Sequence, residues 1–114
     1  MLIKKKDSVK KQIAPDCIVQ EYPLNNKNLD FALAEINGRF PESGKTTNKV
    51  CQEIYYIISG TGTLYIDDKE IELNKGDVYL IGAEKKYHVT GENLNIALAT
   101  SPAWYPEQQE FSDK

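Results

Sequence analysis

The sequence predicts an all-β protein, a sandwich or barrel of about eight or nine short strands. Hydrophobic residues recur with a period of two wherever a period can be read, and turn-forming residues separate these stretches at regular intervals. No segment shows a convincing helical period. The 114 residues are enough for one domain with a substantial core. Antiparallel folds of this kind must hide their sheet edges, and the double-sheet jelly roll is one common solution.

The first half of the chain contains two predicted strands, Cys17–Tyr22 and Phe31–Ile36. The first ends before Pro23 and is followed by an asparagine-rich turn, and the second ends at an Asn-Gly pair. The segment 41–48 is polar and rich in turn formers, which predicts a loop.

The second half opens with a strand over Val50–Ser59 and continues with a hairpin in which polar and apolar residues alternate on both arms. The tail "SPAWYPEQQEF" is expected to form a helical turn after Pro106. The remaining predicted strands are Thr63–Ile66, Glu70–Leu73, Val78–Ile81, Tyr87–Thr90 and Leu94–Thr100.

Charge and composition exclude several classes of function. The net charge of −3 and the pI of about 5.2 argue against nucleic-acid or anionic-membrane binding, since both favour a strongly basic surface. The lysine-rich run 4–11 is expected to be a solvated end of the chain. No apolar run approaches the roughly 20 residues of a membrane span, and no secretory leader is recognisable. We therefore expect a cytoplasmic protein in which Cys17 and Cys51 are reduced thiols.

The strand that begins at Val50 carries a carboxylate in unusual company. Its two faces are both largely apolar, which predicts that one face lines the interior and the other packs on a second sheet or a partner subunit. A glutamate among such residues lies at the wet mouth of a cavity or is paired within it. Alternation places Cys51, Glu53, Tyr55 and Ile57 on one face and Ile54, Tyr56 and Ile58 on the other.

These residues resemble the cupin family. The first cupin motif ends in Glu, six residues and Gly, which Glu53 and Gly60 match. The following hairpin and the pair Gly76-Asp77, which opens the second motif, fall in register over about residues 30–101. The resemblance implies a double-stranded β-helix, or jelly-roll barrel, with N-terminal strands over 1–29 and a tail over 102–114. It also favours a homodimer, formed through an outer sheet face or through exchanged terminal strands.

Cupins bind a divalent transition metal through His, His, Glu and His, but this sequence keeps only the glutamate. The His-x-His positions hold Thr46 and Asn48, or Thr47 and Lys49 in the alternative register. The chain has a single histidine, so a site of several histidines is excluded. Hydroxyl and amide groups are poor ligands for these metals, and we expect no standard metal site. A less orthodox site of Cys51, Glu53 and His88 is a weaker alternative.

The position of the last cupin histidine holds Tyr87, and His88 falls one residue late. Neighbours on a strand face opposite sides, so only one of the two points into the cavity. This residue is Tyr87, unless a one-residue insertion in the loop "GAEKK" brings His88 into register.

Cys51 is expected to be a small buried apolar residue and not a nucleophile. The Trp104-Tyr105 pair is expected to close one end of the barrel or to contact a second subunit.

Three functions stay open at this point. The favoured one is a metal-independent binding protein that holds a small polar molecule in the barrel mouth, with Thr46, Asn48, Cys51, Glu53, Tyr55 and Tyr87 as the candidate ligand contacts. The second is an isomerase, epimerase or lyase acting on a sugar-like or carbonyl compound, with Glu53 or His88 as general base and Tyr87 as acid. The third is a structural or regulatory protein whose barrel is filled by its own side chains, in which Glu53 has only a structural role.

Overall fold

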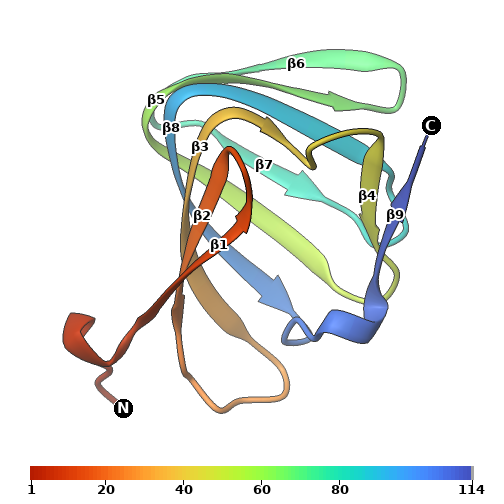
Figure 1. Cartoon of the computed structure of the whole chain (residues 1–114). Helices are drawn as coiled ribbons and strands as arrows, with labels where there is room; N and C mark the ends of the chain where they lie inside the picture. Colours follow the sequence, from red (N-terminus) through yellow and green to blue (C-terminus); the bar gives the residue numbers. More distant parts are fainter. Residues whose placement is uncertain (114) are drawn as a thin grey trace.

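The computed structural model describes residues 1–113 and consists of one curled antiparallel sheet of nine strands (Figure 1). Two short 3-10 turns, η1 (Lys5–Asp7) and η2 (Pro106–Gln108), are the helical elements of this part of the chain. No helix among the described residues could cross a membrane. The strands are β1 (Val9–Ala14), β2 (Cys17–Tyr22), β3 (Asp30–Phe40), β4 (Lys45–Asn48), β5 (Gln52–Ile66), β6 (Lys69–Leu73), β7 (Val78–Ile81), β8 (Tyr87–Ser101) and β9 (Gln109–Ser112).

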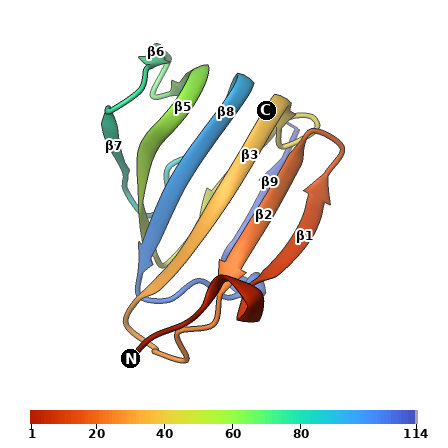
Figure 2. The same ribbon diagram turned by 90° about the vertical axis from the view of Figure 1, so that its left-hand side faces the viewer.

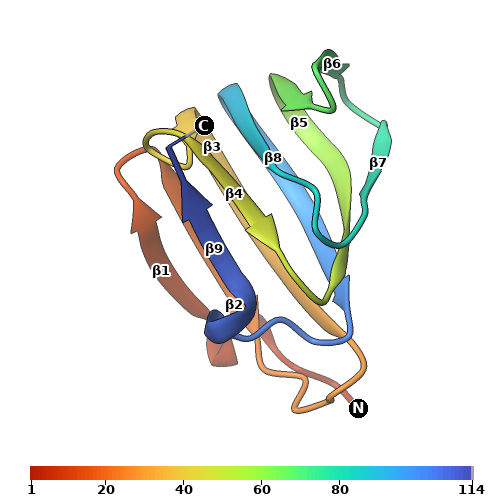
Figure 3. The same ribbon diagram turned by 90° about the vertical axis from the view of Figure 1, so that its right-hand side faces the viewer.

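The sheet curls around a common core in the manner of a jelly-roll barrel, which confirms the predicted fold class. Its main path runs β1-β2-β3-β8-β4-β9, and β5 joins it by pairing with β8, β6 and β7. Figure 2 shows β7, β5, β8, β3, β2 and β1 side by side as one curved layer. Figure 3 shows β4 and β9 lying opposite this layer, so that the interior is enclosed between them.

Three strands are longer than the sequence predicts because glycines bend them without ending them. The predicted turns in β3, in β5 and at residues 91–93 in β8 are wrong, since the ladder continues through each of them. The register shifts at these points, and Gly62 lies directly opposite Gly91. A Cβ atom at Gly62 would lie 2.5 Å from the carbonyl oxygen of Thr90, so the bend needs glycine there.

Three polar strands were not recognised in the sequence. The predicted loop 41–48 contains β4, the tail contains β9, and the lysine-rich end contains η1 and β1. Their side chains are mostly charged or polar, so these segments lack the alternation by which strands are predicted. The helical turn after Pro106 and the β5–β6 hairpin are confirmed. The last residue of the predicted tail lies outside the described residues.

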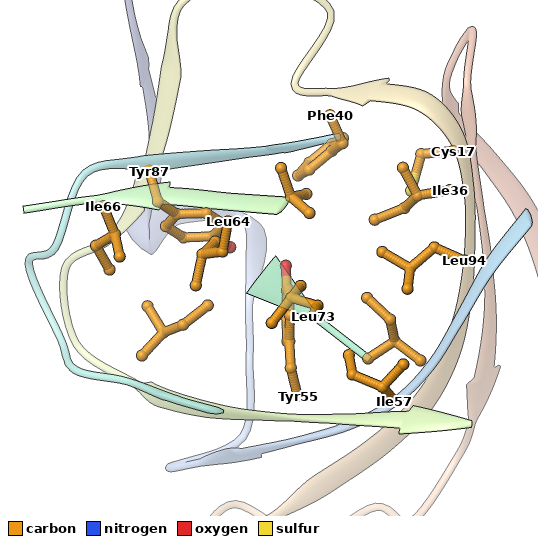
Figure 4. Packing of buried hydrophobic residues seen from close by; sticks show 13 residues of the cluster. Cys17, Ile36, Phe40, Tyr55, Ile57, Leu64, Ile66, Leu73, Tyr87 and Leu94 are labelled. Atoms are coloured by element: carbon orange, nitrogen blue, oxygen red, sulfur yellow. The ribbon is translucent and has the colours of Figure 1, made fainter. Parts of the chain in front are cut away.

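The core fills most of the barrel interior (Figure 4). Its fully buried members are mainly aliphatic and come from β5, β6 and β8: Ile57, Leu64, Leu73, Val89, Leu94 and Ile96. The alternation predicted for β5 is confirmed, since Cys51, Tyr55 and Ile57 are buried whereas Ile54 and Tyr56 are exposed. The buried polar side chains lie together, apart from this aliphatic part of the interior.

Candidate functional site

The buried polar side chains gather where β4 ends, where β5 begins and where β8 ends. This distribution gives the interior an aliphatic half and a polar end. The buried polar residues are Thr46, Thr47, Asn48, Glu53, Thr100 and Gln108. We refer to the group formed by Glu53, Tyr87, Thr100, Asp30, Asn48 and Trp104 as the polar end.

Glu53 is the only carboxyl group among the buried residues of the described chain, with 8% of its surface exposed. It lies on β5 between β7 and β8, opposite Ile81 on one side and Thr100 on the other. The alternation of β5 turns it inward together with Tyr55. An inward carboxyl among apolar side chains is costly unless it is hydrogen-bonded.

Tyr87 supplies that hydrogen bond. Its hydroxyl donates to Oε1 of Glu53 over 3.2 Å, and both residues are buried. The ring of Tyr55 meets the ring of Tyr87 edge-on, with centroids 6.4 Å apart and planes at 86°. Figure 4 shows the two tyrosines pointing into the interior from different walls. The structure thus brings three of the predicted site residues into one cluster.

His88 lies on the opposite face of β8 from Tyr87. Its ring stacks on Tyr65 of β5, with centroids 4.2 Å apart and planes at 7°. Burial, and then the charges of Arg39 and Lys45, lower the pKa of His88 below its ordinary value. Of the two residues between which the sequence could not decide, Tyr87 points into the interior and His88 points away from it.

Burial shifts the pKa values of the acidic groups in this cluster. It raises the pKa of Glu53 from 4.5 to about 7; the hydrogen bond from Tyr87 lowers that pKa and the charge of Asp30 raises it. Burial likewise raises the pKa values of Tyr55 and Tyr87 well above 10, so both phenols stay protonated. Near neutral pH the cluster therefore holds two protonated phenols beside a carboxyl that is close to half-ionised.

Asp30, which the sequence analysis did not single out, connects the tail to the polar end. Its carboxylate accepts hydrogen bonds from the backbone and hydroxyl of Thr100 and from the backbone N–H of Trp104. The indole Nε1 of Trp104 donates to Oδ1 of Asn48 over 3.2 Å. These bonds hold the Trp104 segment beside Asn48 and beside Thr100, which lies opposite Glu53.

Thr46 and Asn48 share the interior with Tyr87 but are held by the tail. Thr46 pairs with Tyr87 in register, and its hydroxyl donates to the Glu110 carbonyl and accepts from the amide of Gln109. Asn48 receives the Trp104 bond described above. These contacts give both residues a structural partner.

Cys51 is buried at the start of β5, and burial, followed by the charge of Glu53, raises its pKa to about 11. The side chain of Gln108, a second residue missed in the sequence, accepts hydrogen bonds from the backbone of Val50 and Cys51. A thiol with a raised pKa is a poor nucleophile. The position of Cys51 therefore suits an apolar residue that lines the interior.

The residues of the polar end do not fit a transition metal. Among residues 1–113 no three or more His, Cys, Asp or Glu side chains lie together in an arrangement that could hold a metal ion. Cys51 and Glu53 face the interior, whereas His88 faces away, so the alternative metal site is not assembled. Thr46, Asn48 and Tyr87 offer hydroxyl and amide groups where imidazoles would be needed.

The cupin domain family model matches residues 35–94, which is more than half of the chain. The chain belongs to the cupin family. No curated protein matches the sequence significantly. The matched range contains the whole Glu53–Tyr87 pair and the glycine bends of this cupin.

Solved structures resemble this cupin over nearly its full length. PAC13 from Streptomyces, described as a nucleoside dehydratase, has a TM-score of 0.88 at 13% identity over 98% of this chain and 90% of its own. A tyrosine-to-phenylalanine variant of PAC13 was solved with uridine. KdgF from Halomonas gives 0.74 at 10% identity, covering 91% and 96% of the two chains. Oxalate decarboxylase from Bacillus subtilis gives 0.78 at 13% identity, covering 94% of this chain and 30% of its own. At these identities the likeness establishes the fold.

Proposed function

We propose that this cupin binds a small, uncharged, polar molecule at the polar end of its barrel, without a metal ion. The observation that carries the proposal is the buried hydrogen bond from Tyr87 to Glu53 beside a core that is mainly aliphatic. A barrel that needed only to be stable would place apolar side chains there. A few polar groups converging within an apolar enclosure are typical of ligand sites.

The charges of the polar end favour an uncharged ligand. Asp30 is the one charged group that acts on the pKa of Glu53, and it raises that pKa. No lysine, arginine or histidine belongs to the buried residues of the described chain. An anion placed beside two carboxyl groups without a cation would be repelled. Uridine, a neutral molecule found with PAC13, is therefore a suitable probe.

The ligand contacts are proposed from the same cluster. Glu53 and Tyr87 provide the hydrogen bonds, and the edge of Tyr55 provides an aromatic wall. Asn48 becomes available when the Trp104 indole leaves it, while Thr46 and Cys51 form the remaining wall. Because Glu53 is 8% exposed, the ligand reaches it only when the Trp104 segment moves.

Calorimetric titration with uridine after treatment with a chelator tests the proposal. We expect saturable one-site binding that weakens by about tenfold or more in Glu53→Gln and Tyr87→Phe, as loss of a buried hydrogen bond implies. Glu70→Gln, which changes an exposed glutamate on β6, is the matched control and should bind as the unaltered protein does. Absence of binding, or equal binding by all four proteins, would refute the proposal.

A second candidate function is acid–base catalysis on the same ligand class. The observation that favours it is the pKa of about 7 at Glu53, which suits a group that exchanges protons near neutral pH. In this account Glu53 accepts a proton from the substrate and Tyr87 donates one to the leaving group. His88 is given no part, because it lies on the opposite face of β8. Glu53→Gln should abolish turnover even at substrate concentrations that saturate the variant, and retained turnover would exclude this role.

We further propose that the protein is a cytoplasmic homodimer. The outward side chains of β7, β5, β8 and β3 form an outer face in which one row of paired residues, Leu80, Ile54, Ala99 and Phe31, carries no charge. The large apolar residues of this outer face are 38–60% exposed. An uncharged row of this kind can pack against its own copy about a two-fold axis. The exposed large residues are Phe31, Ile54, Tyr56, Ile58, Val78 and Leu80.

A further inference from the structure

A hollow of about 450 Å³ lies beside Trp104. It lies between the β2–β3 loop and the segment that follows β8, and the backbone N–H of Ala103 donates to the carbonyl of Lys27 to join the two. Its volume falls in the range of small-molecule sites. The lining residues are Asn25, Asn26, Lys27, Pro102, Ala103, Trp104 and Tyr105.

The two walls of the hollow differ in chemistry. One wall is formed by Trp104 and Tyr105, and the other by Asn25, Asn26 and Lys27, whose side chains end in two amides and an ammonium group. The amide wall is ordered locally, because the side chain of Asn26 accepts a hydrogen bond of 2.8 Å from the backbone of Asn28. Aromatic faces opposite amide and ammonium donors suit a planar ring that bears carbonyl or anionic groups.

Trp104 is a wall shared by the hollow and the barrel interior. Its indole N–H and its backbone N–H are fixed on the inner side, by Asn48 and Asp30. The hollow has a cation, Lys27, whereas the polar end has two carboxyl groups. The two spaces therefore differ in the charge that they accept.

We propose that this hollow is a second binding site, for a planar heterocycle that carries an anionic group. The ring lies against Trp104 and Tyr105, and the anion meets the ammonium group of Lys27. This site is separate from the one proposed around Glu53, and each can fail without the other.

The sole tryptophan of the chain makes the test direct. The whole protein is titrated with uridine 5′-phosphate while Trp104 emission is recorded with excitation at the red edge, and free N-acetyltryptophanamide corrects for absorption by the nucleotide. We expect a saturable change in emission. Tyr105→Ala and Lys27→Ala should each weaken the apparent affinity by about fivefold or more, as loss of one ring contact or one charged contact implies. Both side chains are exposed, so circular dichroism should be unchanged.

Two matched variants separate this site from the interior. Phe111→Ala removes another exposed aromatic ring from the same tail, and Glu53→Gln alters the interior pair; neither should affect the titration. If the emission change disappears in Glu53→Gln, the nucleotide is bound inside the barrel and the inference is wrong. It is equally wrong if the unaltered protein shows no saturable change, or if both hollow variants bind as it does.

Discussion

The hydroxyl of Tyr87, near the start of β8, donates a hydrogen bond to Oε1 of Glu53, near the start of β5, over 3.2 Å. These two strands run antiparallel along their whole length, so the residues come from opposite ends of the pairing and meet across the interior. The bond joins the residue that keeps the cupin glutamate position to the residue that replaces a cupin histidine. A phenol and a carboxyl thus stand where the family pattern has metal ligands.

Tyr87→Phe should raise the pKa of Glu53 further above 7. The hydrogen bond from Tyr87 lowers that pKa, so its removal leaves burial and the charge of Asp30 to act alone. The carboxyl carbon resonance of Glu53, followed against pH, measures the change. Tyr65→Phe, on the outer side of β5, is the control and should leave the resonance unchanged. A pKa that is unaltered or lower in Tyr87→Phe would contradict the assigned role of the hydrogen bond.

Glu53→Gln should change how stability depends on pH. The folded state raises the pKa of Glu53 from 4.5 to about 7, so it binds a proton more tightly than the unfolded chain does. This contribution to stability is fully present below pH 4.5 and is lost as the pH rises to about 7. Relative to the unaltered protein, Glu53→Gln should therefore gain about 2–3 kcal/mol between pH 4.5 and pH 8.

Urea unfolding at several pH values measures this difference. Glu70→Gln, an exposed glutamate on β6, should follow the unaltered protein at each pH. If the curves of Glu53→Gln and the unaltered protein are parallel across this range, the folded carboxyl has an ordinary pKa and the account of the polar end is wrong.

Protein prepared without an affinity tag should contain far less than one transition metal per chain. Besides hydroxyl and amide groups, the polar end offers only the carboxyl groups of Glu53 and Asp30, and His88 lies on the other face of β8. Elemental analysis of the unaltered protein beside Glu53→Ala and His88→Ala should give the same low content. A stoichiometric metal that is lost in Glu53→Ala would overturn the metal-independent account.

Light scattering after size-exclusion chromatography should give twice the 12.9 kDa of one chain. Tyr56→Lys places a charge in the centre of the outer face, which is uncharged in its paired rows, and should shift the mass to that of one chain. Phe111→Lys is the control, because Phe111 is 63% exposed but lies on β9, away from the outer face. A monomeric unaltered protein, or a dimer that persists in Tyr56→Lys, would contradict the proposed interface.

The sequence predicts the inward position of Glu53 because a buried strand alternates strictly, and β5 keeps this alternation from Cys51 to Ile57. It does not predict whether Tyr87 or His88 points inward, because the loop before β8 has no periodic pattern to fix the register. That register is set by distant partners: Ile66 on β5 and Thr46 on β4 both pair with Tyr87.

The other features that the sequence did not predict also depend on contacts between distant parts of the chain. Glycines such as Gly91 read as turns in the sequence, but here they allow continuous strands to bend where two backbones approach closely. Asp30 and Gln108 make hydrogen bonds to residues 57 to 74 positions away, and no local sequence pattern predicts such contacts. Strands β4 and β9 are polar at most positions and lack the alternation by which strands are recognised.

The most direct test of the central claim is the pH titration of the Glu53 carboxyl carbon in chelator-treated protein, with and without saturating uridine. The account predicts a midpoint near pH 7 in the free protein and a displaced midpoint and resonance in the complex. A midpoint near 4.5 that uridine does not move would mean that Glu53 is neither buried with Tyr87 nor in contact with the ligand.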